Sequence, residues 1–350
     1  MKYGILTYHN IPNFGAVLQA FALCEIIRGL GADCELVDYQ CENIINKELT
    51  FHPSKNPAKA LFSRLMIWPK MQKKISGCEE FVRPLYSTEK YDKYNISKAN
   101  EVYDAFISGS DMIWNLDVNG QDYTYFQDFS IENKVGFSYG SSIGAEWSAD
   151  KKEEICSFLQ KYKLLSTREQ DTCLFIENEY GLKCECVVDP TMLFTPEQWD
   201  KYTKPIEAKN YVFVYFPYPE ILIAAKKYAQ RHGKKVIVIG FKTTKGTCNK
   251  ALYSPAEWMS YIKSADAIFT DSYHGLLFSL YFEKKVWTNN QGNRIISLLE
   301  KLGLKDCLIQ RDPDFENKIN YFECYEHINK MREESMFFLS KAIRLTSVMR

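Results

Sequence analysis

Short apolar runs alternate with segments of helical spacing from the start of the chain. Residues 3–8 form a run typical of a buried strand, and residues 16–30 then carry apolar side chains at helical spacing. Residues 34–39 form the next strand-like run, which completes a βαβ unit. The pattern therefore predicts an α/β protein with parallel strands.

The same alternation continues to the end of the chain. Further strands are expected at 103–107, 134–139, 164–167, 186–189, 211–216, 235–239 and 267–270. Helices are expected at 169–180, 221–232, 254–263, 276–282, 295–302 and 331–349. Because single cores stop growing at roughly 250–300 residues, a chain of 350 residues predicts two domains. We place them at 1–195 and 205–330, with a C-terminal helix at about 331–350 packing on the first.

A polar turn between strand 267–270 and the following helix stands out. It reads Asp271-Ser272-Tyr273-His274-Gly275. The first backbone N–H groups of a helix and its dipole together favour a bound anion, and an imidazole beside that anion could move a proton. The alternative interpretation is a helix cap with a hydrogen-bonded core histidine.

Other strand ends carry small or charged residues where parallel sheets bind ligands. Asn13 follows the first strand, with Gln19 in the helix behind it, and Ser110-Asp111 follows strand 103–107. Arg168 follows strand 164–167, where its planar fork suits a carboxylate or a phosphate. Its alternative role is an ion pair with an adjacent acid.

Composition narrows the class of protein. Lys+Arg 44 balances Asp+Glu 44, so no overall basic field indicates nucleic-acid binding. The 11 cysteines are odd in number and include no C-x-x-C pair, which argues against a disulfide framework and a zinc site. The N-terminus runs directly into a strand pattern and no apolar run is long enough to cross a bilayer. We expect a cytoplasmic protein without a metal.

Residues 49–78 contain no acidic side chain. Their basic and histidine side chains are His52, Lys55, Lys59, Arg64, Lys70, Lys73 and Lys74, interleaved with Leu61, Phe62, Leu65, Met66 and Trp68. Such a helix ordinarily packs its apolar face on its own domain. The alternative is peripheral contact with an anionic membrane through residues 55–75, at the inner face of the membrane.

Six motifs occur in a fixed order along the chain. They are GILTYHNIPNFGAVLQAFAL at 4–23, ISGSDMIWN at 107–115, LSTREQDT at 165–172, VDPTML at 188–193, ADAIFTDSYHGLLFS at 265–279 and NRIISLLEKLGL at 293–304. Together they resemble the polysaccharide pyruvyl transferase family over nearly the whole chain.

The resemblance implies two Rossmann-like domains facing a central cleft, as in GT-B-like glycosyltransferases. It also implies transfer of the enolpyruvyl unit of phosphoenolpyruvate onto a sugar of a bacterial surface polysaccharide or its precursor, giving a pyruvate ketal and phosphate. No metal or organic cofactor is implied, since phosphoenolpyruvate is a co-substrate. The acceptor is expected to be a sugar or a lipid-linked oligosaccharide.

The family's donor-site residues fall on His274, on Arg168 and on the basic residue Arg294. One branch of the family carries Arg-Leu-His where this chain has Ser272-Tyr273-His274, and Lys where Arg294 stands. The chain therefore has one donor fewer for the phosphoryl group at that turn, which Ser272, the helix start or the lysines of the basic loop expected at 241–250 could replace.

Phosphoenolpyruvate carries two anionic groups, so its site needs two anion-binding fixtures. We expect Arg168 and Arg294 to supply guanidinium forks, and Ser272 and Gly275 to present the helix start. A protonated His274 would deliver the proton to the methylene carbon.

The acceptor is expected on the first domain, near Asn13, Gln19 and Ser110. Asp111 would accept the proton of the attacking hydroxyl, although turn aspartates commonly cap helices instead.

Two rival functions remain open. A nucleotide-sugar glycosyltransferase of the same architecture would need an acidic residue gripping a ribose, and Glu283, which we expect inside a helix, is a candidate. A non-catalytic carbohydrate-binding member would bind sugar without releasing phosphate.

Overall fold

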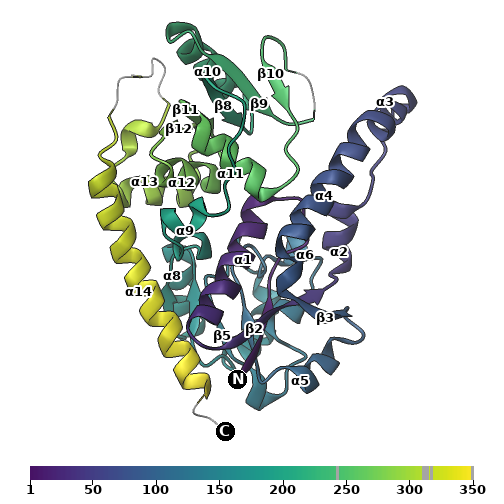
Figure 1. Cartoon of the computed structure of the whole chain (residues 1–350). Coiled ribbons are helices and arrows are strands. Elements are labelled where there is room, and N and C mark those ends of the chain that lie inside the picture. Colours follow the sequence, from purple (N-terminus) through teal and green to yellow (C-terminus); the bar gives the residue numbers. More distant parts are fainter. Residues whose placement is uncertain (242–243, 310–314, 316–317, 348–350) are drawn as a thin grey trace. The chain divides into compact units, whose positions relative to one another are not determined.

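The computed structural model describes residues 1–241, 244–309, 315 and 318–347 (Figure 1). The chain divides into two compact units. Unit 1 comprises Met1–Thr50, Cys78–Phe194 and the chain from Met331, and unit 2 comprises Phe51–Gly77 and Thr195–Lys330. The first domain expected from the sequence runs unbroken over 1–195, whereas residues 51–77 group with unit 2. Gly77 is one point of close packing in unit 2, because a Cβ there would lie 2.2 Å from the Tyr253 carbonyl oxygen.

Unit 1 is built on a parallel sheet with the strand order β3-β2-β1-β4-β5. Its strands are β1 (Lys2–Leu6), β2 (Asp33–Tyr39), β3 (Tyr86–Tyr91), β4 (Ala105–Ser108) and β5 (Phe137–Ser138). A separate parallel pair consists of β6 (Leu165–Thr167) and β7 (Cys184–Cys186). The helices of this unit are α1 (Phe14–Gly29), α2 (Glu42–Ile44), α5 (Ala99–Val102), α6 (Leu116–Asn119), α7 (Lys152–Leu159) and α8 (Gln170–Tyr180).

Unit 2 repeats the same topology. Its parallel sheet has the order β10-β9-β8-β11-β12. The strands are β8 (Tyr211–Tyr215), β9 (Lys235–Ile239), β10 (Cys248–Lys250), β11 (Ala267–Thr270) and β12 (Lys285–Trp287). The helices are α3 (Pro57–Phe62), α9 (Pro196–Asp200), α10 (Pro219–Arg231), α11 (Pro255–Ser264), α12 (Tyr273–Tyr281) and α13 (Asn293–Lys301). In both sheets the first strand of the unit is central, which is the Rossmann arrangement.

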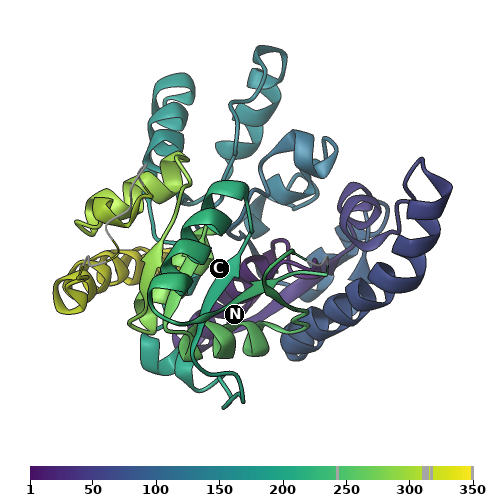
Figure 2. The same ribbon diagram turned by 90° about the horizontal axis from the view of Figure 1, so that it is seen from above.

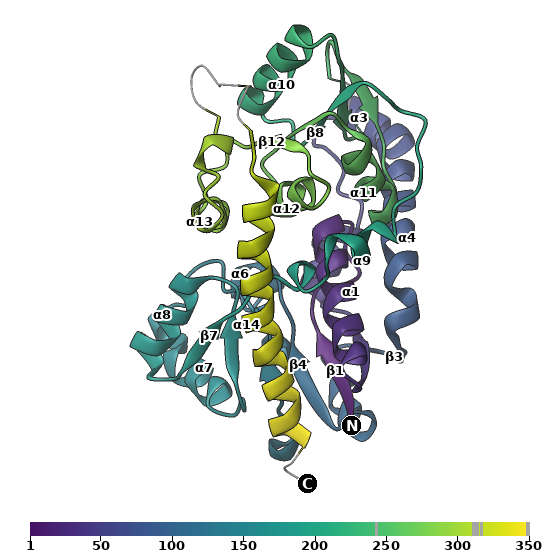
Figure 3. The same ribbon diagram turned by 60° about the vertical axis from the view of Figure 1, so that its left-hand side comes forward.

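Two long helices each have some residues in unit 1 and some in unit 2. Helix α4 (Trp68–Val82) continues the line of α3 through a π-helical turn at Ser63–Ile67 (Figures 1 and 2). Helix α14 (Tyr321–Ser347, Figure 3) begins earlier in the chain than the helix expected from the sequence at 331–349. Its unit 1 portion is bound to that unit, since Arg332 donates to the carbonyl oxygen of Met192 at 2.7 Å.

The sequence pattern misses three strands, and each lies at a sheet edge. Strand β3 has exposed positions along its middle, β10 is largely exposed, and β12 is only three residues long, so none carries a buried apolar run. Strand β7 lies two residues earlier than expected, and of the strand expected at 134–139 only Phe137–Ser138 forms. Positions 242–243 of the loop expected at 241–250 lie outside the described residues.

None of the eleven cysteines, all of which lie among the described residues, forms a disulfide bond. Among the described residues, no helix has both the length and the apolar character needed to cross a membrane.

Candidate functional site

The strand order of unit 1 reverses between β1 and β4, and open parallel sheets bind ligands at the carboxyl ends beside such a point. The chain leaving β4 turns at Gly109, where a Cβ would lie 2.9 Å from Cβ of Thr7. Glycine therefore permits the two strand ends to approach closely. The Thr7 hydroxyl donates to the Ser110 carbonyl oxygen at 2.9 Å, which joins the two turns.

Asp111 lies on this edge in a strained conformation. Its φ is 76°, in the left-handed region that residues other than glycine rarely occupy. Its carboxylate accepts a hydrogen bond from the Met112 N–H at 2.8 Å, and its backbone pairs with Ser141 in a parallel bridge. Burial and then the charge of Asp111 raise the pKa of Tyr8, so the Tyr8 hydroxyl stays protonated beside this carboxylate.

Asn13 and Gln19 take different positions at the start of α1. Asn13 is exposed and caps the helix, since its side-chain oxygen accepts from the Gly15 N–H at 3.0 Å. Gln19 is fully buried, and its amide nitrogen donates to Thr7 Oγ1 and to the Ala16 carbonyl oxygen, both at 2.9 Å. Gln19 thus ties α1 to the end of β1, and contact of either residue with an acceptor stays a prediction.

Arg168 is buried rather than on the surface, with 3% of its side chain exposed. Its Nη1 lies 2.8 Å from Asp189 Oδ2 and 3.3 Å from Ser110 Oγ, and its Nε lies 3.2 Å from Glu169 Oε1. The structure therefore brings Arg168 and Ser110 together. The ion pair with an adjacent acid, expected as the alternative role of Arg168, forms with Glu169. Donor binding by Arg168 stays a prediction.

A buried histidine–aspartate pair at this edge is absent from the sequence-based site. His9 follows β1 and is 1% exposed, and Asp38 lies at the end of β2 and is 4% exposed. The Nδ1–H of His9 donates to the Thr7 carbonyl oxygen at 2.9 Å, which leaves Nε2 facing Asp38 Oδ1 at 3.6 Å. The ring of Tyr86 contacts His9 edge-on at 4.8 Å, and burial and then Asp38 raise the pKa of Tyr86. The sequence signal that could have indicated this pair is that His9 and Asp38 are polar residues at the ends of two predicted strands.

Unit 2 has its own reversal point between β8 and β11, where Thr270 pairs with Tyr215. The turn after β11 opens α12, and Ser272 is its N-cap, with Oγ accepting from the Gly275 N–H at 3.2 Å. Asp271 holds the turn to the neighbouring strand, because its carboxylate accepts from the Asn289 N–H at 2.7 Å. The predicted strand, turn and helix are thus present, and the cap expected as the alternative interpretation forms with Ser272.

Gly275 is required by close packing of α12 on β11. A Cβ at this position would lie 2.6 Å from Thr270 Oγ1. We expect Gly275→Ala to lower the free energy of unfolding by about 1–3 kcal/mol, the usual cost of overpacking. Gly29→Ala is the matched control, since nothing lies within 4 Å of its Cβ and alanine favours helix by about 1 kcal/mol. Urea denaturation of the two variants measures the difference, and equal stabilities would contradict this packing argument.

Tyr273 contacts both Arg294 and His274. The guanidinium carbon of Arg294 lies 4.5 Å from the centre of the Tyr273 ring, and the Tyr273 and His274 rings meet edge-on at 5.4 Å. Arg294 belongs to the first turn of α13, whereas the sequence places it in the preceding loop. A cation, an imidazole and the positive end of α12 therefore lie together in unit 2.

An aromatic stack follows β8 on the same edge. Phe216 stacks on Tyr215 with ring centres 4.4 Å apart, and Tyr218 lies 6.4 Å further along. Phe216 has a φ of 61° and is 42% exposed, and Tyr218 is 56% exposed. A bulky residue in the left-handed region indicates a constrained position. This position could not be predicted from the sequence, because the strain lies in the backbone.

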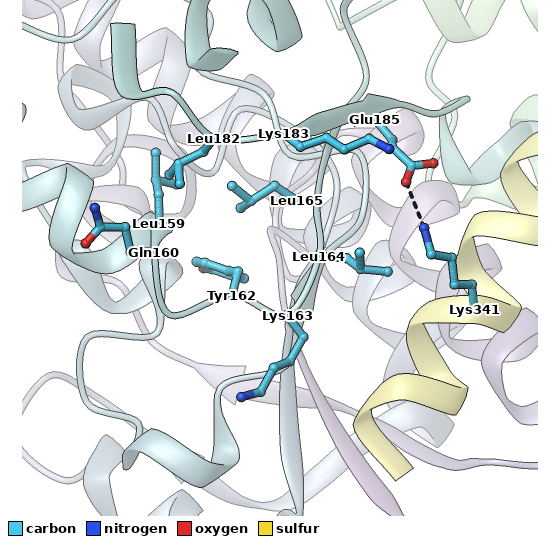
Figure 4. A pocket seen from close by; sticks show the side chains of 10 residues that line it. All are labelled: Leu159, Gln160, Tyr162, Lys163, Leu164, Leu165, Leu182, Lys183, Glu185 and Lys341. Atoms are coloured by element: carbon cyan, nitrogen blue, oxygen red, sulfur yellow. Dashed lines mark hydrogen bonds and ion pairs between the residues drawn. The ribbon is translucent and has the colours of Figure 1, made fainter. Parts of the chain in front are cut away.

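A pocket in unit 1 lies elsewhere, at the amino ends of β6 and β7 (Figure 4). Its volume is about 220 Å³, and it is partly open to solvent. Its lining combines Leu159, Leu164, Leu165 and Leu182 with Lys163, Lys183 and Lys341, and it contains none of the predicted site residues. Within the described part of the chain, no group of three or more histidine, cysteine, aspartate or glutamate side chains could hold a metal ion.

A sequence model of polysaccharide pyruvyl transferases matches residues 13–288. The chain belongs to the polysaccharide pyruvyl transferase family. The matched stretch of this family contains Arg168 and the whole turn from Ser272 to Gly275, and Arg294 lies beyond its end. A search of curated proteins finds no match for this family member.

Solved structures show the fold of this pyruvyl transferase family member. UDP-GlcNAc 2-epimerase from Methanocaldococcus jannaschii is similar with a TM-score of 0.51 at 10% identity, over 95% of this chain and 93% of that one. An alpha-glucosyltransferase in complex with UDP and DNA is similar with a TM-score of 0.51 at 8% identity, over 100% of this chain and 92% of that one. The expected GT-B-like fold of two Rossmann-like domains is confirmed.

Proposed function

We propose that this chain transfers the enolpyruvyl unit of phosphoenolpyruvate to two hydroxyls of one sugar, forming a cyclic ketal and releasing phosphate. The observation that carries the proposal is the cluster of Arg294, Tyr273 and His274 at the start of α12, with Tyr273 and His274 inside the stretch that matches the family. Phosphoenolpyruvate is anionic at both ends, and the cluster offers a guanidinium fork and a helix N-terminus for one of them.

Arg294 is the guanidinium group that we propose for this turn. It lies over the Tyr273 ring, so its side chain is held at the start of α12 at little entropic cost. Ser272 caps the helix and Gly275 lets the backbone lie close to β11, and both would keep the helix start in place for the phosphoryl group.

Arg168 is the second proposed anion-binding group. It is already bound to two carboxylates, and the longer contact, to Glu169 at 3.2 Å, is the one that the substrate carboxylate would replace. The contact with Asp189 would hold the Arg168 guanidinium in place while the substrate is bound.

In the proposed reaction, His274 gives a proton to the methylene carbon of phosphoenolpyruvate, which creates an oxocarbenium-like centre. A sugar hydroxyl attacks this centre as the hydroxyl proton passes to a base. The carbon–oxygen bond to phosphate then breaks, and the second hydroxyl closes the ring and releases its own proton. Of the two hydroxyl protons, one restores His274 and the other leaves with phosphate. No metal or organic cofactor enters this scheme.

Asp111 is the proposed base, with Asn13, Gln19 and Ser110 on the acceptor side. We expect Asp111→Asn to lower the rate of phosphate release by about 10²–10⁴-fold, the usual contribution of a general base. Asparagine also tolerates the left-handed conformation, so the variant should keep the wild-type melting temperature. Steady-state kinetics and thermal melting together measure this, and a normal rate would remove Asp111 from the mechanism.

A nucleotide-sugar glycosyltransferase is the second candidate. It is favoured by the exposed rings of Phe216 and Tyr218 at the reversal point of unit 2, which could stack on a base, and by similar structures in complex with UDP. Glu283, the acidic residue suggested for ribose, lies after the end of α12 rather than within it, with a φ of 54°. It therefore lies at the opposite end of that helix from His274.

Binding and turnover separate the candidates. We expect phosphoenolpyruvate to raise the melting temperature, UDP-GlcNAc to have no effect, and phosphate to be released with one sugar of a panel of soluble and lipid-linked acceptors. Stabilisation by UDP-GlcNAc alone would favour the glycosyltransferase. Sugar binding without phosphate release would favour a non-catalytic carbohydrate-binding role. We propose a bacterial surface polysaccharide precursor as the acceptor and the cytoplasm as the site of the reaction.

A further inference from the structure

The helical stretch from Pro57 to Gly77 (Figures 1 and 2), which we call the basic helix, exposes large apolar side chains on adjacent turns. Four of them are more than half exposed, namely Leu61 at 60%, Phe62 at 60%, Leu65 at 62% and Met66 at 53%. Their spacing of one, three and one residues places them side by side on the helix. The expectation that this apolar face packs on its own domain is therefore wrong for these four residues.

A π-helical turn lies in the middle of this exposed face, at Ser63–Ile67. Such turns are costly and occur frequently at functional sites. Further along, Trp68 contacts Phe51 with ring centres 5.5 Å apart and is only partly exposed. The Trp68 end is thus packed, and the exposed apolar face is confined to residues 61–66.

The charged side chains around the apolar face at 61–66 are all basic. Residues 49–78 contain no aspartate or glutamate. Lys55, Lys59, Arg64 and Lys73 are exposed, and Lys70 is partly exposed. An apolar face flanked by cations matches a surface that is negatively charged outside and apolar just beneath. A protein surface offers that combination less readily, because its apolar patches and its negative charges lie in one layer.

We propose that the basic helix docks this protein on an anionic lipid bilayer, with Leu61, Phe62, Leu65 and Met66 inserted at the headgroup boundary and the flanking cations on the lipid phosphates. The helix lies in the plane of the interface, since among the described residues no helix combines the length and the apolar character needed to cross a bilayer. The docking itself does not depend on the proposed reaction. Its consequence, that a lipid-linked acceptor is met at the bilayer surface, rests on that reaction.

Vesicle sedimentation with the full chain tests the docking, without sugar or phosphoenolpyruvate. We expect binding to vesicles of phosphatidylcholine mixed with phosphatidylglycerol, weak binding to phosphatidylcholine alone, and a decline with added salt. The variant Leu61→Ser/Phe62→Ser/Leu65→Ser/Met66→Ser should lose about a hundredfold in partitioning. The variant Lys55→Gln/Lys59→Gln/Arg64→Gln/Lys73→Gln should lose about fivefold for each cation removed.

Matched controls come from exposed positions elsewhere. The control for the apolar variant is Ile223→Ser/Leu174→Ser. Ile223 is 67% exposed on α10, and Leu174 is 46% exposed on α8. Lys201→Gln/Lys209→Gln serves for the charge variant, as both lysines are exposed. These controls should bind vesicles like the wild type, and all variants should keep its melting temperature, because the changed side chains are exposed.

Two outcomes would overturn the proposal. The first is a wild type that does not bind anionic vesicles, or variants of the basic helix that bind like their controls. The second is a concentration-dependent dimer that the serine variant abolishes while vesicle binding stays unchanged, which would identify a second copy as the partner. Phosphate release with a soluble acceptor is unaffected by either outcome, so failure of the docking and failure of the reaction are distinguishable.

Discussion

Replacing His274 with alanine is expected to lower the rate of phosphate release from phosphoenolpyruvate by about 10²–10⁴-fold, the usual loss for a missing general acid. The imidazole lies in the first turn of α12 and meets the Tyr273 ring, over which the guanidinium of Arg294 lies. Removing the ring leaves the backbone and the cation in place, so the loss should appear in kcat more than in KM. Steady-state kinetics with a fixed acceptor measures it.

His232→Ala is the matched control for this change. His232 is an exposed histidine at the end of α10 in the same unit, and its ring stacks on Tyr228 with centres 4.2 Å apart. We expect its rate to stay within about twofold of the wild type, since surface substitutions rarely exceed ±0.5 kcal/mol. A His274→Ala enzyme with the same rate as His232→Ala would mean that His274 is not the acid.

Asp189→Ala is expected to lower the free energy of unfolding by about 3–5 kcal/mol, the cost of breaking a buried ion pair by removing one partner. Asp189 is fully buried, and one of its oxygens lies 2.8 Å from Arg168 Nη1. The other oxygen accepts from the N–H and the hydroxyl of Thr191 at 3.0 and 2.7 Å. Alanine would remove the nearest carboxylate from the buried Arg168 cation and an acceptor from two donors of Thr191. Urea denaturation measures the change.

An exposed ion pair provides the comparison. Lys152 and Glu179 lie 2.9 Å apart with about half of each side chain exposed, at 49% and 51%. We expect Glu179→Ala to cost less than about 1 kcal/mol, as exposed pairs do. If Asp189→Ala were no more costly than Glu179→Ala, the Arg168–Asp189 contact would not hold this part of unit 1 together.

The fold was predictable where burial is complete on both faces of a strand. Strand β11 occupies residues 267–270 as expected, because all four of its residues are buried and the run ends abruptly at Asp271. Edge strands lack that signal. Strand β3 has the sequence YSTEKY, in which three consecutive residues are exposed, so its pairing with β2 is fixed by the sheet and not by its own pattern.

The candidate site was predictable where one local motif supplies it, and not where distant residues meet. The turn from Ser272 to Gly275 follows from a strand that runs directly into a helix. The stacking of Arg294 on Tyr273 depends on how α13 packs, and the His9–Asp38 pair depends on which strands are neighbours. Neither relation has a fixed spacing in the sequence, so both required the three-dimensional structure.

Mass spectrometry of the acceptor tests the central claim most directly. The account predicts that incubation with phosphoenolpyruvate raises the mass of one sugar acceptor by that of pyruvic acid less one water, with one phosphate released for each acceptor modified. Both products should be absent with His274→Ala at matched times. An acceptor of unchanged mass with phosphoenolpyruvate, which instead gains a hexose unit from a nucleotide sugar, would contradict the account and identify a glycosyltransferase.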